Sequence, residues 1–314
     1  MIVTLTANPA LDRTITLAAA LRPGEVQQAL ALREDAGGKG VNVSRAIAAA
    51  GLDTVAVLPI AADDPYRGVL QASGIPIRAV LVAHHVRTNT AITDPLGETT
   101  KLNLPGAALT ADEADALIAA VVEASGEADW LVLAGSLPAG VADTFYVDVI
   151  AAVRARWATD APRIAVDTSG GALRAVVAHG AADLIKPNED ELAELTGTTK
   201  PAEKDLIASA HVSARRIVPD RVAAALVTLG GAGAVLATAD GTWSAGAPRI
   251  RVASTVGAGD SSLAGYLIAD ASGADAADRL RSAIRYGAAA ASLGGTQAPA
   301  PADLGTDAIP VRSL

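Results

Sequence analysis

The chain has 314 residues, of which 51% are hydrophobic, 19% are charged and 3% are aromatic. This composition supplies enough apolar residues for one large core or two modest ones, and it argues against intrinsic disorder. With 25 Lys and Arg against 34 Asp and Glu the net charge is −9, so nucleic acid and anionic membranes are poor partners. A phosphorylated ligand would have to bind at a local cluster of positive charge.

Cysteine is absent, which excludes disulfides, thiolate catalysis and Cys-ligated metal sites. The first residues lack the basic segment and apolar run of a signal peptide. The longest uncharged run, Val222–Ala239, is interrupted by three glycines, which indicates a strand, a turn and a second strand rather than a membrane helix. We therefore expect a cytoplasmic protein with no membrane partner.

In the first third of the chain, short strands alternate with turns. An apolar strand is predicted over Ile2–Ala7 and ends at the turn signal Asn8-Pro9, and a helix is predicted over Val41–Ala50. Asp94–Gly97 is a turn signal between two polar strands and predicts a hairpin. Further strands are expected over Thr14–Leu17, Glu25–Leu32, Thr54–Leu58, Arg87–Thr93 and Thr99–Leu104.

From Thr110 onward the pattern becomes regular. A capping box at Thr110–Glu113 predicts a helix to about Ser125, and after it strands and helices alternate. Strands are expected over Trp130–Ala134, Ile164–Asp167, Leu184–Lys186 and Ala224–Leu229. Helices are expected over Thr144–Trp157, Gly171–Ala178, Glu189–Leu195, Glu203–Arg216, Ala258–Ala269 and Ala274–Ser292.

This alternation is typical of an α/β fold, in which helices cover both faces of a parallel sheet. The early polar strands do not fit that sheet. We therefore expect a single domain, residues 1–314, with a small β-sheet lid formed by inserted segments at about 12–34 and 87–104.

The segment Ser254–Ser261 carries the strongest chemical signal. Its small residues permit a tight turn, and an apolar helix follows, so the backbone N–H groups at the helix start would form an anion site. Asp260 would lie beside that anion and could act as a general base toward a hydroxyl. A capping role for Asp260 in a glycine-rich connection is an equally good interpretation of these residues alone.

A second glycine cluster, Asp35–Asn42, also opens a helix. Its glycines allow a ligand to approach the backbone, and Lys39 and Asn42 add a charge and an amide. The spacing does not match a P-loop, because Arg33 occupies the first glycine position and Gly40 the Ser/Thr position. We favour a binding role over a flexible turn.

Two further segments are weaker signals. The turn Leu229–Ala234 lacks dinucleotide-binding spacing, so a backbone contact to a nucleotide and a simple hairpin turn are both open. In Lys186–Leu192, Asn188 and Glu191 share a helix face and suit a water-bridged Mg²⁺, but helix capping is the better explanation of these residues alone. The histidines form no metal-binding pattern, and no serine-hydrolase elbow is present.

Taken in order, these segments resemble the ribokinase-like carbohydrate kinases, the PfkB family. The resemblance spans nearly the whole chain and depends on six motifs in the family's order. They are Asn8–Asp12, Gly37–Arg45, Gly135–Pro138, Lys186–Asn188 with Glu191, Thr228–Gly233 and Thr255–Asp260.

The resemblance implies a Rossmann-like three-layer α/β/α sandwich with a β-sheet lid that often also joins two subunits, so a homodimer through the lid is expected. It implies phosphoryl transfer from ATP, with Mg²⁺, to a sugar hydroxyl. The Asn8–Asp12 opening and the Leu102–Gly106 stretch are closest to the branch that acts on phosphorylated sugars. Within it we expect transfer to the C6 hydroxyl of D-fructose 1-phosphate, giving fructose 1,6-bisphosphate. Tagatose 6-phosphate and fructose 6-phosphate are the alternative acceptors, and a sugar-phosphate-binding protein without activity is a further alternative.

The same resemblance assigns roles to individual residues. Asp260 matches the catalytic base, and Gly257, Ala258 and Gly259 match the anion hole for the transferred phosphoryl group. Sugar-contacting positions are matched by Asp12, Gly38, Lys39, Asn42, Arg87 and Ser136, and Arg87 and Lys101 could face the phosphate already on the sugar. Nucleotide-contacting positions are matched by Lys186, Asn188, Thr228, Leu229, Gly230, Gly231, Ala232, Gly233, Gly259 and Asp260. Asn188 and Glu191 match the pattern tied to the metal.

Two positions depart from the family's pattern. The glycine pair after the second core strand is replaced by Ala61–Asp64, which leaves the role of that loop open. Lys101 occupies a variable lid position, where a cation suits either a 1-phosphate or a 6-phosphate.

Overall fold

The computed structural model describes residues 1–180, 182–199 and 202–314. Within them, ten strands form a main sheet in the order β14-β13-β12-β11-β10-β9-β8-β1-β4-β5. The strands from β11 to β5 in that order run parallel, and β12, β13 and β14 are antiparallel to their neighbours. The expected parallel sheet is therefore confirmed, with an antiparallel extension at one edge.

The strands of the main sheet are short. Their bounds are β1 Ile2–Thr6, β4 Thr54–Ile60, β5 Ile77–Leu81, β8 Trp130–Ala134, β9 Arg163–Asp167, β10 Leu184–Ile185, β11 Ala224–Thr228, β12 Ala234–Thr238, β13 Gly241–Ala245 and β14 Arg312–Ser313. The α-helices are α1 Lys39–Ala49, α2 Tyr66–Ala72, α3 Ala111–Ala124, α4 Phe145–Trp157, α5 Gly170–Ala175, α6 Glu189–Thr196, α7 Leu206–Arg215, α8 Ala258–Ala271 and α9 Ala276–Ser292.

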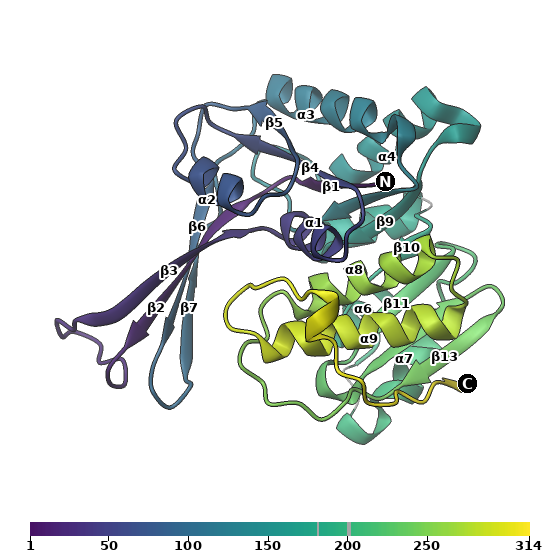
Figure 1. Ribbon diagram of the computed structural model, residues 1–314. Helices are drawn as coiled ribbons and strands as arrows, with labels where there is room; N and C mark the ends of the chain where they lie inside the picture. Colours follow the sequence, from purple (N-terminus) through teal and green to yellow (C-terminus); the bar gives the residue numbers. More distant parts are fainter. Residues whose placement is uncertain (181, 200–201) are drawn as a thin grey trace.

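Helices cover both faces of the main sheet (Figure 1). Helices α3, α4, α5, α6 and α7 pack on one face through a core that includes Leu117, Val149 and Val176. Helices α1, α8 and α9 pack on the other face, where Ile47 and Leu263 are fully buried. Because β1 and β8 have helices on both sides, every residue in them is buried, as the apolar runs in their sequences predict. The result is the three-layer α/β/α sandwich that the sequence led us to expect.

The early polar strands form a separate small sheet that projects from the main body (Figure 1). Its order is β3-β2-β6-β7, with bounds β2 Ala10–Leu17, β3 Ala29–Gly37, β6 Arg87–Thr93 and β7 Thr99–Asn103. Strands β2 and β6 are parallel, and the outer pairs are antiparallel. The predicted hairpin around Asp94–Gly97 is present, and Asp94 accepts hydrogen bonds from the N–H groups of Leu96 and Glu98.

Most predicted boundaries agree with the structure to within three residues. The small sheet differs more, because β2 begins at Ala10 rather than Thr14 and β3 ends at Gly37 rather than Leu32. The predicted helix Gly171–Ala178 ends as an α-helix at Ala175 and continues as a π-turn over Val176–Gly180. The predicted strand Glu25–Leu32 begins only at Ala29, because the preceding residues form a turn in which Gln27 binds the backbone of Ala20 and Arg22. Among the described residues, no helix is long and apolar enough to cross a membrane.

Candidate active site

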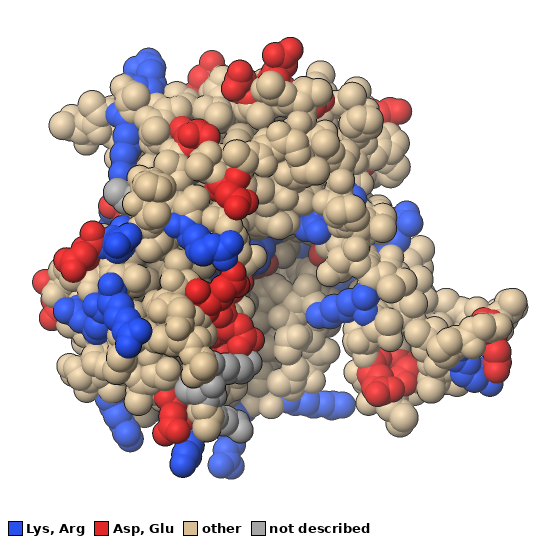
Figure 2. Space-filling view, turned by 180° about the vertical axis from the view of Figure 1, so that it is seen from behind, with Lys and Arg blue, Asp and Glu red and all other residues tan. Residues whose placement is uncertain are grey.

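A cavity of about 610 Å³ opens where the parallel strands of the main sheet reach their carboxyl ends. Helices α1 and α8 both begin at this cavity, and the small sheet borders it through Asp12, Arg87 and Asn89. Figure 2 shows the hollow between the main body and the projecting small sheet, with acidic and basic side chains at its margins. In parallel α/β sheets this edge is where ligands bind.

Asp260 lies in the first turn of α8 and faces the cavity, although only 7% of the residue is exposed. Its Oδ2 accepts a hydrogen bond of 2.8 Å from Nδ2 of Asn42 in α1. Burial, together with the nearby charge of Asp167, raises the pKa of Asp260 to about 6, against the opposing effect of Lys39. A carboxylate with a pKa in this range can accept a proton at neutral pH and release it again.

The start of α8 presents free N–H groups beside Asp260. Gly257 precedes the helix in the left-handed conformation (φ 77°). The first hydrogen bond of the helix runs from the N–H group of Ser261 to the carbonyl of Gly257. The N–H groups of Ala258, Gly259 and Asp260 therefore have no acceptor within the helix and point toward its amino end. Such a helix start attracts an anion through its N–H groups and its dipole.

A second buried carboxylate, Asp167 at the end of β9, lies at the centre of a charge network. Lys39 Nζ donates to its Oδ1 at 2.8 Å, and Lys186 Nζ forms an ion pair with its Oδ2 at 3.2 Å. Asp167 and Lys186 are buried, whereas the Lys39 side chain is 36% exposed. Burial opposes the ionisation of both Asp167 and Lys39. The opposite charges that surround each residue outweigh burial, so the pKa of Asp167 is lowered and the pKa of Lys39 is raised.

On the side of the small sheet, Asp12 and Asn89 face each other across β2 and β6, and Nδ2 of Asn89 donates to Oδ1 of Asp12 at 2.9 Å. Burial raises the pKa of Asp12. Gly37 leaves room for this pair, because a β-carbon there would displace the Asp12 carboxylate. The buried Oδ1 atoms of Asn42 and Asn89 have no hydrogen-bond partner among the described residues, so both can accept from a ligand hydroxyl.

The opposite side of the cavity is formed by glycine turns. Thr228, Gly230, Gly231 and Gly233 line it after strand β11. Gly233 (φ 104°) tolerates no side chain, because a β-carbon would meet the carbonyl of Ala245. The backbone itself therefore forms this wall, which fits a flat ligand held through main-chain groups.

Asn188 and Glu191 line the cavity, and they also cap α6. Oδ1 of Asn188 accepts from Glu191 N–H at 2.8 Å, and Oε2 of Glu191 accepts from Asn188 N–H at 2.9 Å. This is the capping explanation that the local sequence favoured. No group of three or more His, Cys, Asp or Glu residues able to hold a metal occurs in the described parts of the chain.

Most of the residues singled out from the sequence come together in this cavity, but four do not line it. Lys101 is exposed on β7 in the small sheet. The Leu229 and Ala232 side chains pack against the hydrophobic core. Ser136 lies just outside, where Oγ accepts from Nδ2 of Asn8 at 3.4 Å.

Two polar residues on which the geometry above depends, Asp167 and Asn89, were not singled out from the sequence. Asp167 is the last residue of a strand that was predicted, and a carboxylate at the carboxyl end of a parallel strand is a signal that could have identified it. Asn89 lies in a polar strand where every second residue faces the same way, so only the pairing of β6 with β2 brings it next to Asp12.

Comparisons with known proteins agree with this geometry. The sequence model described as pfkB family carbohydrate kinase matches residues 5–303. The chain is 34% identical to a 1-phosphofructokinase of Rhodobacter capsulatus over 96% of this chain and 93% of that protein. It is also 35% identical to a 1-phosphofructokinase of Haloferax volcanii, over 95% and 93%. The crystal structure of phosphofructokinase-2 from Escherichia coli in complex with fructose-6-phosphate superimposes with a TM-score of 0.84 at 30% identity, covering 96% of each chain.

Proposed function

Because the chain belongs to the pfkB family of carbohydrate kinases, we propose that it transfers the γ-phosphoryl group of ATP to the C6 hydroxyl of D-fructose 1-phosphate, giving ADP and fructose 1,6-bisphosphate. One observation carries the reaction type: a buried carboxylate, Asp260, lies beside the free N–H groups of a helix start at the edge of a large cavity. The names of the relatives at 31–35% identity over most of the chain support the choice of acceptor.

In this proposal Asp260 accepts the proton of the C6 hydroxyl as its oxygen attacks the γ-phosphorus. The bond from that phosphorus to the bridging oxygen of ADP breaks, and ADP leaves with the electron pair. The N–H groups of Ala258, Gly259 and Asp260 stabilise the charge on the oxygens of the transferred group. Asn42, which donates to Asp260, fixes the carboxylate for this role.

Substrate binding divides between the two sides of the cavity. Thr228 and the glycine turn after it support the nucleotide through the backbone, next to Lys186. Asp12, Asn42 and Asn89 suit sugar hydroxyls, because they combine a carboxylate with two free amide oxygens. Arg87 and Lys39 supply the positive charge that the phosphates need, which an overall charge of −9 does not provide.

ATP is used by kinases of this type as its magnesium complex, and the residues present fit such an ion. Glu191 lines the cavity with only Oε2 engaged in the capping box, and Asn188 lies beside it. Mg²⁺ usually takes one or two protein carboxylates and completes its shell with water and phosphate oxygens. When bound, the ion would neutralise part of the phosphate charge. Glu191 and Asn188 would hold it through water.

The alternative acceptors remain those of the same family. A relative from Mycobacterium tuberculosis that is 32% identical over 85% of this chain is an ATP-dependent 6-phosphofructokinase isozyme 2, so fructose 6-phosphate is the first competitor. Lys101, which occupies a lid position that varies among phosphosugar kinases, does not line the cavity and favours neither acceptor.

A substrate panel tests the proposal. Initial rates of ADP release with MgATP are measured against fructose 1-phosphate, fructose 6-phosphate and tagatose 6-phosphate, and kcat/KM is compared. We expect fructose 1-phosphate to give the highest value. A preference for either 6-phosphate would overturn the acceptor and leave the kinase class intact, whereas no ADP release with any of them would leave only a binding protein.

We further propose that the small sheet acts as a lid on a single domain and also joins two copies of the chain. Strand register places Leu32 of β3 and Leu102 of β7 on the face opposite Asp12, and these side chains are 60% and 57% exposed. An apolar face of this kind, turned away from the cavity, suits a second copy. Light scattering of Leu32→Glu with Leu102→Glu should give a monomer, and an unchanged mass would exclude this face.

A further inference from the structure

The loop that follows β4, Ala61–Tyr66, departs from the family's glycine pair, and the reaction above does not account for it. It lies at the junction between the main body and the small sheet. Two of its polar residues are almost completely buried: Asp64 is 5% exposed and Tyr66 is not exposed at all. Both direct their polar atoms toward the base of the small sheet.

Asp64 accepts two backbone hydrogen bonds. Its Oδ1 accepts from Tyr66 N–H at 2.9 Å, at the start of α2, and its Oδ2 accepts from Val86 N–H at 2.6 Å. Val86 is the residue immediately before β6, and the next residue is Arg87, which lines the cavity. The carboxylate therefore ties the entry of β6 to the main body.

Tyr66 makes the matching contact on the other side. Its hydroxyl donates to the carbonyl of Gly37 at 2.7 Å. Gly37 is the last residue of β3, and the next residue, Gly38, lines the cavity at the start of α1. The phenol ring is packed into the core beside Leu58 and Leu70, so the hydroxyl has little freedom to move.

Strand register shows that these two contacts belong to one arrangement. Ala10 of β2 pairs with Gly37 on one side and with Arg87 on the other. The loop thus holds β3 and β6, the two neighbours of β2, at the row where the small sheet leaves the main body. Asp12 lies two residues beyond Ala10 in β2, and Asn89 lies two residues beyond Arg87 in β6. Both are therefore about 7 Å from the row of Ala10, Gly37 and Arg87.

We infer that Asp64 and Tyr66 are positioning residues for the sugar-phosphate side of the cavity: they fix the base of the small sheet and so set where Arg87, Gly38 and the Asp12–Asn89 pair lie relative to Asp260. This inference rests on the proposed function. Neither residue lines the large cavity. Their effect is exerted through the backbone of Val86 and Gly37.

Three substitutions test this role. Tyr66→Phe keeps the ring and removes one hydrogen bond, Asp64→Asn leaves an oxygen for one of the two N–H groups, and Asp64→Ala removes both acceptors. We expect the KM for the sugar phosphate to rise about three- to tenfold in Tyr66→Phe and Asp64→Asn, and further in Asp64→Ala, as the loss of a net hydrogen bond implies. The KM for ATP should stay within about twofold, because the glycine turns of the nucleotide side line the cavity and Asp64 and Tyr66 do not.

Asp63→Asn is the matched control. Asp63 is in the same loop and carries the same charge, but its carboxylate is exposed and pairs with the exposed His85 at 3.1 Å. Its kinetic constants should equal those of the unmodified protein. A thermal melt of each variant measures the loss of stability separately.

The outcomes separate the inference from the proposed function. If Tyr66→Phe and Asp64→Asn leave the sugar KM within about twofold, or lower kcat with both KM values unchanged, the two residues are merely structural and the inference is wrong. All ratios are taken with the sugar phosphate that the unmodified protein prefers in the substrate panel. A different preferred sugar would therefore correct the acceptor without affecting this test.

Discussion

Helix α8 carries two buried aspartates, one at each end, and their surroundings differ. Asp260 in the first turn is 7% exposed, and Asp270 in the last turn is 6% exposed. Because the two residues share residue type, burial and helix, a difference in their roles must come from the groups that contact each carboxylate. Asp260 faces the carboxyl ends of the strands, and Asp270 faces the amino ends of β8 and β9.

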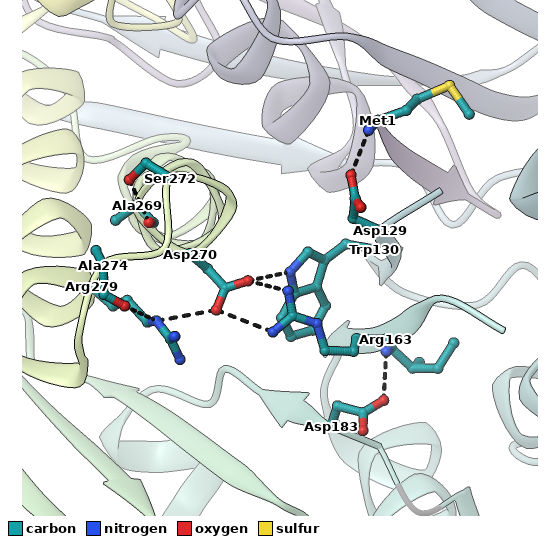
Figure 3. Close-up of polar contacts among 11 residues, drawn as sticks. Met1, Asp129, Trp130, Arg163, Asp183, Ala269, Asp270, Ser272, Ala274 and Arg279 are labelled. Carbon is teal, nitrogen blue, oxygen red and sulfur yellow. Dashed lines mark hydrogen bonds and ion pairs between the residues drawn. The ribbon is translucent and has the colours of Figure 1, made fainter. Parts of the chain in front are cut away.

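Asp270 is surrounded by donors (Figure 3). Its carboxylate accepts from Trp130 Nε1 at 2.8 Å and from both terminal nitrogens of Arg163, and it forms an ion pair with Arg279 Nε at 3.1 Å. The Arg163 guanidinium also stacks 4.4 Å from the centre of the Trp130 ring. Two cations and four donors satisfy this carboxylate fully, so it joins α8 and α9 to the main sheet.

Asp260 has fewer partners. It accepts one hydrogen bond from a described side chain, Asn42, and the negative charge of Asp167 raises its pKa further. The cations Lys39 and Lys186 are bound to Asp167 rather than to Asp260. The comparison shows that saturating a buried carboxylate with cations makes an anchor, whereas leaving it short of partners makes a proton acceptor with a raised pKa.

The largest effect is expected from removing the proton acceptor. We predict that Asp260→Asn lowers kcat at least ~10²-fold, because a general base contributes about that much, while the KM for ATP changes little. Steady-state ADP release measures both. Turnover within a few-fold of the unmodified protein would show that Asp260 is not the base.

The same substitution at the other end of α8 should affect stability instead. We predict that Asp270→Asn lowers the free energy of unfolding by about 2–3 kcal/mol, because charged hydrogen bonds are lost and two arginines lose their counter-ion. Its kinetic constants should stay within about twofold. Urea unfolding gives the free energy. The control is Asp129→Asn at the same edge, where an exposed ion pair with the amino terminus should contribute less than about 1 kcal/mol.

Asp260→Asn should also make the protein more stable near neutral pH, the reverse of Asp270→Asn. Since burial raises the pKa of Asp260 from 3.8 to about 6, its ionisation costs folding free energy that grows between these pH values and is fully present above pH 6. We predict a gain of about 1–3 kcal/mol at pH 7.5, taking about 1.36 kcal/mol per pKa unit. The gain should disappear below about pH 4, where Asp260 is protonated in both the folded and the unfolded chain. Unfolding curves at the two pH values measure it, and equal stability at pH 7.5 would contradict it.

The comparison also shows what could be predicted from the sequence. The start of α8 was recognisable from its local residues, because a glycine turn before an apolar helix determines where the N–H groups point. Asn42 and Asp260 were each predicted as site residues, yet their hydrogen bond depends on how α1 packs on α8. The residues around Asp270 come from β8, β9 and α9, and nothing in the local pattern of any one of them indicates the others.

The small sheet gives the same lesson. Its hairpin was predicted from the turn residues Asp94–Gly97. The parallel pairing of β2 with β6, which brings Asn89 to Asp12, joins segments far apart in the chain and leaves no periodic signal.

In this account, Asp260 has few partners and accepts the proton of the sugar hydroxyl. The most direct test is the pH dependence of kcat/KM for the sugar phosphate, measured in the unmodified protein and in Lys39→Met. We predict an acidic limb near pH 6, because Asp260 must be ionised to accept a proton. Lys39 lowers the pKa of Asp260, so Lys39→Met should move the limb to higher pH. Lys101→Met, which removes the same charge from the exposed strand β7, should leave it in place, and this control also accounts for titration of the substrate phosphates. A limb at the same pH in all three proteins, or a rate independent of pH between about 5 and 8, would contradict the account.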